Sequence, residues 1–468
     1  MALLPHWNKI LFDQTKQKFS INPIKFSDLN TIFFNNSCPL FFQFIEKCFE
    51  SEGKEFLKYY PNLQKLFFNI KEILPIRLPI LEKSAKNKKI SLKRKQVALI
   101  FLLSFFGCLQ ANKINRFHVW NRLIKNTTKE LEFGRCFLNY LTTIGKWLKQ
   151  NNPILEDDII YLRNNIQDKS IYSSEEVDLC EIQFHEKDSM FNGKESYCVD
   201  FANKYIGGGV LNAGCVQEEI LFAKEPEATV AMFFMEVMDD NDAIGIFNTI
   251  EYSRTSGYVD KFKFEGTAIT DDLLKIKKHR LIAIDALINI NYIRKYQKFQ
   301  NQNYQNYFDQ NNAYFRNDQF LNIKNNNFTF YQNTNFPYNL NKAYNPFIQI
   351  INKNQFNQKD IIRDIHKAYV GFNLINLYGN NIEKTIATGN WGCGAFGGNH
   401  ELKFIQQWIA ASFAGVKRLD YYTFSHNKMQ NAITFYESVK NKYQKADNLY
   451  RAIVNNNFKD DKIIVNLL

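Results

Sequence analysis

Several residue types that mark particular classes of protein are scarce in this sequence. With 10 prolines and 20 glycines in 468 residues, a collagen-like chain is excluded. The eight cysteines include no CxxC pair, so we expect reduced thiols in an intracellular protein and neither a disulfide framework nor a zinc site. The seven histidines show no HExxH or other metal-ligand spacing, and no GxSxG motif occurs. We therefore expect no metal, no cofactor and no serine nucleophile.

Long apolar runs are absent as well. The longest, Val97–Leu109, has 13 residues, well short of the roughly 20 that cross a bilayer. The segment Met1–Ile10 contains no apolar stretch of the kind that a secretory signal needs. We therefore expect a soluble protein without a membrane partner.

Acidic residues are fewer than basic ones, 47 against 59, which gives a formal net charge of +12. This balance favours polyanionic partners such as nucleic acid, phosphorylated polymers or anionic membranes, and does not choose among them. Basic residues are concentrated in Lys83–Lys95, directly before the apolar segment that begins at Val97. A solvated loop or helix start is the commoner explanation of such a run, and a nuclear-import signal or a polymer-binding patch is the alternative.

What is present is a change of hydrophobic period along the chain. In residues 1–150, apolar side chains recur every three or four positions, as in Leu40–Phe49. This spacing predicts amphipathic helices. From Asp157 onward, short β-like runs alternate with glycine turns and helical stretches, as in an α/β domain. We therefore predict an all-helical accessory region at 1–150 and an α/β domain at 151–468. The expected strands are Ile159–Leu162, Ile182–His185, Tyr197–Phe201, Ala243–Ile250 and Arg280–Asp285.

The segment 296–358 interrupts this pattern. It holds 18 Asn and 10 Gln, no Gly and two Pro, with aromatic residues interspersed. Such a polar tract gains too little from burial to offset the entropy lost on ordering, so we predict a disordered or loosely attached insertion. A tolerated loop insertion is favoured over a prion-like role. The ordered pattern resumes at Asp360 with a helix that runs through His366–Phe372.

One constellation that could carry chemistry is the segment Val199–Ile220. A strand ends near Phe201, three glycines follow, and Gln217, Glu218 and Glu219 stand at the start of a short helix or turn that Pro226 ends. Consecutive glycines let a backbone approach a ligand closely, because no Cβ stands in the way. Adjacent helical residues point about 100° apart, so the two glutamates should differ in role. A glycine turn with glutamates at a positive helix N-terminus remains the alternative. The predicted ligand-contacting glycines are Gly207, Gly208 and Gly209.

A second constellation is Ile386–Gly398, followed by a helix from about His400 to Ala414. A β-like approach, a glycine-rich loop and a helix N-terminus together make an anion site, since free backbone amides and the helix dipole favour a phosphate. The spacing GxxGxGxxGG fits neither a Walker A loop nor the GxGxxG of a dinucleotide fold. Phosphate binding is favoured over a merely tight loop.

Aromatic residues form a third group, in Tyr252–Tyr258 and in Asp420–Phe424. Rings at strand ends beside a phosphate loop could stack on a base. In a sequence with 15% aromatic residues, a core position is the commoner explanation for any one ring.

Taken together, VDFANKYIGGGVLNAGCVQEEI and ATGNWGCGAFGG closely resemble the poly(ADP-ribose) glycohydrolase family, whose signature is a triple glycine followed by Gln-Glu-Glu. The resemblance covers most of the chain, apart from its termini and the Asn-rich insertion. It implies a macrodomain-type α/β fold, a mixed sheet between helices, with a helical region ahead of it. It also implies hydrolysis of the ribose–ribose bonds of poly(ADP-ribose), with release of ADP-ribose.

The resemblance further implies roles for individual residues. Glu219 matches the general acid/base, and Glu218 matches the glutamate that holds ribose hydroxyls. Asp200 and Asn203 match positions that support this loop and the terminal ribose, and Gln217 lies in the same segment. Further positions match the substrate-binding loop and the aromatic residues that pack on adenosine: Asn390, Gly392, Gly394, Ala395 and Phe396 in the loop that binds the diphosphate, and Tyr258 and Phe424 beside the adenosine.

Two other functions stay open: a reader module that binds ADP-ribose without turnover, and a hydrolase of targets that carry a single ADP-ribose. The intact Gln-Glu-Glu argues against the reader. As partners, the resemblance implies poly(ADP-ribose), its ADP-ribose product and poly(ADP-ribosyl)ated proteins, for a monomer that takes part in the DNA damage response. We expect it in the nucleus and cytoplasm, because the basic run only weakly favours the nucleus.

Overall fold

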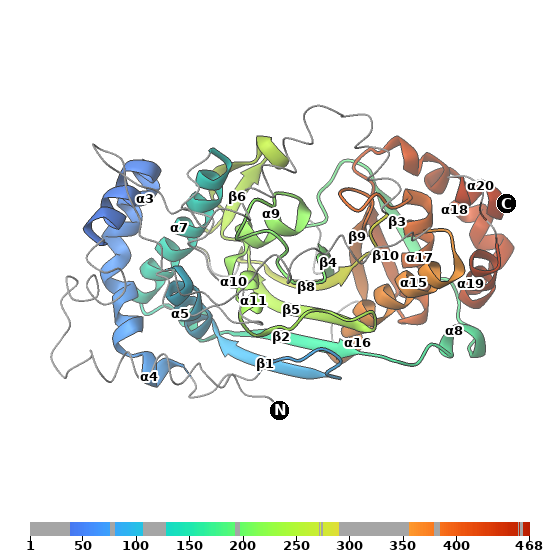
Figure 1. Cartoon of the computed structure of the whole chain (residues 1–468), viewed down its shortest axis with the longest axis horizontal. Helices are drawn as coiled ribbons and strands as arrows, with labels where there is room; N and C mark the ends of the chain where they lie inside the picture. The colour runs from blue at the N-terminus through green and yellow to red at the C-terminus, as the bar shows by residue number, and fades with distance from the viewer. Residues whose placement is uncertain are drawn as a thin grey trace, which may run out of the picture.

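A mixed eight-stranded sheet with helices on both of its faces forms the centre of the molecule (Figure 1). The computed structural model describes residues 38–74, 80–105, 128–191, 197–270, 275–289, 355–378, 384–456 and 462–468, and residues 272 and 458. Within these ranges, no helix combines the length and the apolar character that crossing a membrane requires.

The strands follow the order β1-β2-β5-β8-β4-β9-β10-β3 across the sheet. The five strands from β8 to β3 run parallel to one another, and β5, β2 and β1 add antiparallel strands at one side. A separate pair, β6 and β7, is antiparallel. The bounds are β1 Lys88–Lys93, β2 Asp158–Asn165, β3 Glu181–His185, β4 Tyr197–Ala202, β5 Asp242–Ile250, β6 Ser253–Ser256, β7 Lys263–Thr267, β8 Lys278–Asp285, β9 Thr385–Gly389 and β10 Arg418–Tyr422.

Side chains from the two faces of the sheet contribute to two separate hydrophobic cores. Successive side chains of a strand point to opposite faces, so Leu281 and Ala283 of β8 enter one core while Ile282 and Ile284 enter the other. Both cores are apolar because the central strands are covered on both sides, as parallel strands usually are. The sheet therefore acts as a rigid platform whose strand ends carry the loops.

Most helices from the first half of the chain supply one core. The helices from the C-terminal part, together with one short helix from the first half, supply the other (Figure 1). The first group is α3 Cys38–Phe68, α4 Ile70–Ile73, α5 Arg94–Phe105, α7 Thr128–Lys149, α9 Gln217–Lys224, α10 Pro226–Thr229 and α11 Ala231–Phe234. The second group is α8 Ile171–Ser174, α15 Gln358–Phe372, α16 Leu374–Leu377, α17 His400–Phe413, α18 Gln430–Tyr443, α19 Ala446–Val454 and α20 Ile463–Leu467.

The expected strands and the helices after Asp360 and His400 are confirmed within a few residues. Asparagine caps fix the starts of both helices: the side chain of Asn357 accepts from the amide of Asp360 at 2.9 Å, and that of Asn399 accepts from Leu402 at 2.8 Å. The predicted insertion lies outside the described residues, except for positions 355–358 at its end.

The N-terminal region departs from the all-helical prediction at the basic run. Residues Lys88–Lys93 form strand β1, which pairs antiparallel with β2 at the edge of the sheet. Ile90 and Leu92 are buried there while lysines face solvent. The segment thus has the alternation of buried and exposed residues typical of a strand, which its high charge obscured in the sequence. Lysines on an edge strand also discourage pairing with another chain. Part of the run that was expected to be a solvated loop or helix start is thus a strand, and Arg94 begins α5 directly after it.

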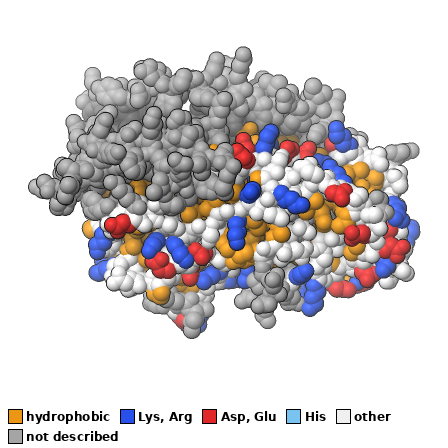
Figure 2. Space-filling model, turned by 90° about the horizontal axis from the view of Figure 1, so that it is seen from below, with side chains coloured by type: hydrophobic (Ala, Val, Ile, Leu, Met, Phe, Trp, Pro, Cys, Tyr) orange, Lys and Arg blue, Asp and Glu red, His pale blue; other side chains and the backbone are white. Residues whose placement is uncertain are grey.

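Positive charge is dispersed on the surface that Figure 2 presents. Lys and Arg side chains stand among Asp and Glu side chains across the described part of this face. Within the described part of this face, the positive charge is therefore not gathered into one large patch.

Candidate functional site

The parallel strands of the sheet bring the three predicted segments to one edge. β4 leads into the triple glycine, β9 ends at Gly389 before the second glycine loop, and β10 leads to Phe424. Because β4, β9 and β10 are parallel neighbours, their carboxyl ends open at the same edge, where ligands of α/β sheets usually bind. The segments predicted to act together are therefore neighbours.

Gln217, the first residue of α9, fastens this helix to β4. Its side-chain Oε1 accepts from the amide of Phe201 at 2.8 Å, and its Nε2 donates to the carbonyl of Val199 at 3.2 Å. Both ends of the carboxamide therefore bind the strand and set the position of the glutamates that follow. The predicted contact of Gln217 with substrate stays a prediction.

Glu218 is buried, and two backbone amides hold its carboxylate. Its Oε2 accepts from the amide of Asn203 at 2.9 Å, and its Oε1 accepts from the amide of Gly207 at 2.7 Å. Burial raises its pKa well above the usual value, and the nearby carboxyls of Asp200 and Glu219 raise it further, although the two amides act in the opposite direction.

Glu219 is held in the same manner on the neighbouring side of the turn. Its Oε1 accepts from the amide of Gly209 at 2.8 Å, and its Oε2 accepts from the amide of Val216 at 2.9 Å. The second bond closes the first turn of α9 as in a capping box. Only 6% of Glu219 is exposed, so its carboxyl is fixed rather than free to move in solvent.

Gly208 lies between the two carboxylates. A Cβ at this position would be 2.4 Å from Oε2 of Glu218 and 2.5 Å from Oε1 of Glu219, and its φ of +48° favours glycine. The amide of Gly208 donates to the carbonyl of Tyr205 at 2.9 Å. The triple glycine thus makes room for the glutamates and supplies amides to them, and the predicted contact of its three glycines with substrate stays a prediction.

Asn203 shapes the start of the same turn. Its backbone amide donates a hydrogen bond to Glu218, and its side-chain Oδ1 accepts one from the amide of Tyr205 at 3.0 Å. Such a bond from an Asn side chain to the backbone two residues on stabilises a turn. Its predicted role at the terminal ribose is untested, and its observed role is local.

Asp200 lies on β4 beneath the glutamates and is fully buried. Neither of its oxygens has a hydrogen-bond partner among the described residues. Burial raises its pKa well above the usual value, and the charges of Glu219 and Glu225 raise it further. The raised pKa favours the protonated form of Asp200, and protonation limits the negative charge below the two glutamates.

The second glycine loop, residues 389–398, presents unpaired amides. The amides of Gly394, Ala395 and Phe396 donate none of the hydrogen bonds made by the described residues, and Gly394 and Ala395 are exposed. A Cβ at Gly394 would meet nothing within 4 Å, so protein packing does not explain this glycine. Successive free amides can bind an anion such as a diphosphate.

The base of this loop is rigid. Asn390 donates from Nδ2 to the carbonyl of Thr423 at 3.1 Å, which ties the loop to the segment that carries Phe424. Trp391 is fully buried and donates from Nε1 to the carbonyl of Ile284 at 2.9 Å. A Cβ at Gly392 would be 2.5 Å from the Cβ of Ala286, so glycine is required for this close approach.

Tyr258 and Phe424 are exposed large rings beside this edge, with 51% and 56% of their surface accessible. Tyr258 lies between β6 and β7. The backbone amide of the adjacent Val259 donates a hydrogen bond to the carbonyl of Cys215 at 3.1 Å. Partial burial raises the pKa of Tyr258 to about 12, with Glu219 adding to the rise and a backbone bond with Gln217 opposing it. Phe424 has a φ of +53°, an uncommon conformation for a residue with a large side chain. Neither ring is part of a core.

Sequence reasoning missed the residues that support the second loop. Trp391 stood within the motif without a role, and Ala286, Asn289 and Lys403 lie outside it. No periodicity or spacing marks them, because their contacts join separate parts of the chain. The described residues contain no group of three or more His, Cys, Asp or Glu that could hold a metal ion.

Two family models match the chain. One is described as poly(ADP-ribose) glycohydrolase, macro domain fold, and matches residues 169–315 and 319–431. The other is described as the helical domain of the same enzyme and matches residues 49–161. The match confirms the predicted macro-type fold and places the helical part at the N-terminal side; the predicted boundary at 150/151 stays a prediction.

Curated relatives carry the same description. The chain is 28% identical over 448 residues to "Poly(ADP-ribose) glycohydrolase 1" of Arabidopsis thaliana, covering 87% of this chain and 79% of the relative. It is 27% identical to "Probable poly(ADP-ribose) glycohydrolase 2" of the same plant, over 66% of this chain and 56% of the relative. It is 30% identical to "Poly(ADP-ribose) glycohydrolase 1" of Caenorhabditis elegans, over 59% of this chain and 30% of the relative.

Proposed function

Because this chain belongs to the poly(ADP-ribose) glycohydrolase family, a family of glycosidases, we propose that it hydrolyses the ribose–ribose bonds of poly(ADP-ribose) and releases ADP-ribose. The observation that carries the proposal is the pair of buried glutamates around Gly208, at the strand edge where the free amides of the second loop also stand. A carboxyl pair beside an anion site suits a phosphorylated sugar polymer.

Glu219 acts in this proposal as the general acid and then as the general base. Glycosidic cleavage passes through an oxocarbenium-like state, in which the bond between the anomeric carbon and the leaving ribose oxygen breaks. The protonated carboxyl of Glu219 gives its proton to that oxygen. The carboxylate then takes a proton from water while the water oxygen bonds to the anomeric carbon. The amides of Gly209 and Val216 hold the carboxyl in place through both steps.

Glu218 and the second loop bind the substrate in this scheme. Glu218 accepts hydrogen bonds from ribose hydroxyls, and the fixed amides of Asn203 and Gly207 keep its carboxyl oriented. The amides of Gly394–Phe396 bind the diphosphate, and Tyr258 and Phe424 pack against adenosine. Positive net charge increases the rate of encounter with a polymer that carries two phosphates per unit.

The test is incubation of labelled poly(ADP-ribose) with the wild type and with Glu219→Gln, following release of ADP-ribose and polymer binding separately. We expect release by the wild type, and binding with at least 10³-fold slower release by the variant. Glu251→Gln is the matched control, because Glu251 pairs with Lys224 on the outer side of α9 and should keep full activity.

Other outcomes select the alternatives. Binding without release by the wild type as well would identify a reader module. Release from protein carrying a single ADP-ribose, but not from polymer, would identify a hydrolase of mono-ADP-ribosylated targets. No binding at all would contradict the proposal.

Further proposals concern the oligomeric state, the partners and the cellular location of the protein. We propose that the protein acts as a monomer on poly(ADP-ribosyl)ated proteins during the DNA damage response, in both nucleus and cytoplasm. Fractionation of cells followed by activity assays would test the location, and light scattering would test the monomer.

A further inference from the structure

A short segment after β8, Ala286–Asn289, runs along the second glycine loop. Asn289 makes two hydrogen bonds to the loop: its amide donates to the carbonyl of Phe396 at 2.8 Å, and its Nδ2 donates to the carbonyl of Gly397 at 3.1 Å. Both accepting carbonyls directly follow the free amides of Gly394–Phe396. Asn289 therefore holds the end of the anion-binding stretch.

Each of the two peptide units held by Asn289 is also bonded at its N–H. The unit that carries the Phe396 carbonyl donates from Gly397 to the carbonyl of Gly394 at 3.0 Å, and the next unit donates from Gly398 to the carbonyl of Gly392 at 2.8 Å. Because a peptide unit is planar, bonds at both of its ends fix its orientation. Two successive units are fixed in this way, and Asn289 supplies one bond to each.

Fixed geometry matters here because the loop is rich in glycine. Glycine has more backbone freedom to lose than any other residue, so a loop of this composition would have to order itself on binding a ligand. Ordering the loop in advance removes this cost from the binding step. The hydrogen bonds from Asn289 supply part of that order, at the end of the stretch that carries the free amides.

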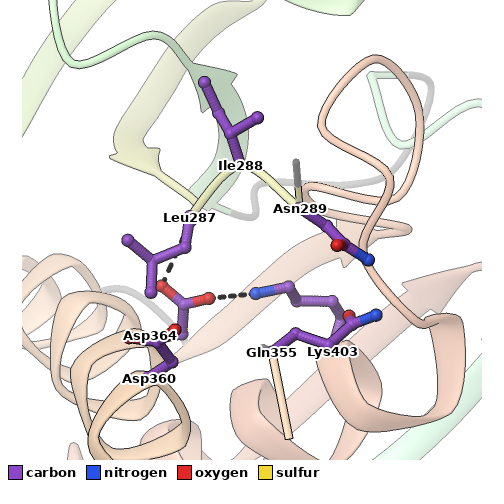
Figure 3. Close-up of a pocket in the computed structure, with 7 residues that line it drawn as sticks. All are labelled: Leu287, Ile288, Asn289, Gln355, Asp360, Asp364 and Lys403. Carbon is purple, nitrogen blue, oxygen red and sulfur yellow. Dashed lines mark hydrogen bonds and ion pairs between the residues drawn. The ribbon is translucent and has the colours of Figure 1, made fainter. Parts of the chain in front are cut away.

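The segment that carries Asn289 is itself anchored to a buried ion pair, as Figure 3 shows. The amide of Leu287 donates to Oδ1 of Asp364 at 3.3 Å, and Asp364 pairs with Lys403. Both charged side chains are 2% exposed, and Nζ of Lys403 lies 4.9 Å from the centre of the Trp391 ring within the loop. The ion pair thus supports both the segment and the loop.

We propose that Asn289 is a positioning residue that presets the amides of Gly394–Phe396 for the diphosphate of an ADP-ribose unit. The proposal rests on the function proposed above. Asn289 does not touch the reacting atoms. Replacing it should therefore weaken the binding of the substrate and of the transition state by the same amount. Such a residue changes KM and leaves kcat nearly unchanged.

The test compares the wild type, Asn289→Ala and Asn289→Asp for hydrolysis of poly(ADP-ribose) and for binding of ADP-ribose and adenosine. Loss of one hydrogen bond should raise KM and the Kd for ADP-ribose about 5-fold in Asn289→Ala, with kcat within about 2-fold. Asn289→Asp should lose more, because a carboxylate cannot donate and repels the diphosphate. Adenosine lacks the diphosphate and should bind all three proteins equally.

Gln355→Ala is the matched control. Gln355 lines the same small pocket as Asn289, yet its carboxamide accepts from the amide of Asn399 at the start of α17 and not from the loop (Figure 3). This variant should keep the affinity for ADP-ribose. Equal losses in Gln355→Ala and Asn289→Ala would overturn the proposal, since general loosening of the pocket would then explain both.

The outcomes separate this inference from the proposed function. A wild type that neither hydrolyses poly(ADP-ribose) nor binds ADP-ribose would refute the proposed function. A wild type that does both, with Asn289→Ala and Asn289→Asp unchanged in KM and in Kd, would refute the role of Asn289 alone. Equal weakening of adenosine and ADP-ribose would also refute it, because that pattern indicates a damaged fold.

Discussion

Two glycine-rich segments stand at the same edge of the sheet and use their amides in opposite ways. In the segment around Gly208, the amides of Gly207 and Gly209 donate to the carboxylates of Glu218 and Glu219 within the protein. In the loop around Gly394, three consecutive amides donate to no other described residue. The first segment stabilises the protein's own negative charge, and the second leaves its donors for an external one.

The comparison shows that glycine richness alone does not indicate an anion site. What distinguishes the two segments is the presence of acidic residues close enough to use the amides. Two carboxylates in the first segment occupy the donors, so this segment suits acid/base chemistry. In the second segment, no carboxylate of the described residues accepts from the amides of Gly394–Phe396, so this segment suits diphosphate binding. Substitutions in each segment should therefore affect different kinetic constants.

Among substitutions of the glycines in the two segments, the largest effect should come from Gly208→Ala. The added Cβ would displace both glutamate carboxylates, and small displacements of catalytic groups can cost about 100-fold. We expect kcat for poly(ADP-ribose) to fall by about that factor, measured under saturating substrate, while ADP-ribose still binds.

Gly415→Ala is the control for backbone strain in this experiment. Gly415 also has a positive φ, +69°, but a Cβ there would meet nothing within 4 Å. If it lowered kcat as much as Gly208→Ala, strain and not the displaced carboxylates would account for the loss.

A smaller effect, on binding alone, is expected for Gly394→Ala. The added methyl group would enter the open space in front of the free amides, where the diphosphate is proposed to lie. Calorimetry should show affinity for ADP-ribose reduced about 10-fold, equivalent to about 1.4 kcal/mol, with an unchanged melting temperature. Unchanged affinity would mean that these amides do not bind the diphosphate.

The exposed rings should contribute less than the loop. Phe424→Ala and Tyr258→Ala should each weaken binding of adenosine and of ADP-ribose about 5-fold, near the lower end for stacking on a base, because both rings are half exposed. Titration with the two ligands measures this directly. Loss of affinity for ADP-ribose without loss for adenosine would place the rings elsewhere on the ligand.

The smallest predicted change concerns stability and arises from Asp200, whose pKa is raised in the folded state. Its raised pKa means that the folded state keeps the proton at pH values where the unfolded state has released it, so Asp200 lowers stability as the pH rises above about 4. Asp200→Asn should therefore raise the melting temperature by a few degrees at pH 7 and by little at pH 4.

Asp242→Asn provides the opposite case. Burial opposes ionisation of Asp242, but the charge and hydrogen bond of Arg163 at 2.6 Å, together with hydrogen bonds from the Asp239 amide and the Asn165 side chain, lower its pKa overall. Its stabilising effect is present above the unfolded value near pH 4 and is lost as the pH falls through the folded value. This variant should lower the melting temperature at pH 7. Changes of the same sign in both variants would contradict the raised pKa of Asp200 in the folded state.

Much of this arrangement could be predicted from the sequence where the signal is local. The strand that carries Asp200, the short helix at Gln217 and the loop after Gly389 follow from alternation, glycine content and the stop at Pro226. The strand Lys88–Lys93 was missed because its three lysines outweighed the two apolar residues that the sheet buries.

Non-local contacts explain the other omissions. That the amides of Gly207 and Gly209 bind carboxylates depends on how the chain returns ten residues later. The bonds from Asn289 to the second loop join residues more than 100 positions apart, and no spacing rule reports such a pair.

A double-mutant cycle of Gly208→Ala and Gly394→Ala tests most directly whether the first segment serves catalysis and the second serves diphosphate binding. Single-turnover rates at saturating polymer and Kd values for ADP-ribose would be measured for the wild type, both single variants and the double variant. The account predicts that the saturated rate falls only with Gly208→Ala, that Gly394→Ala lowers the affinity without lowering this rate, and that the double variant shows both losses in full. A loss of the saturated rate in Gly394→Ala equal to that in Gly208→Ala would contradict it.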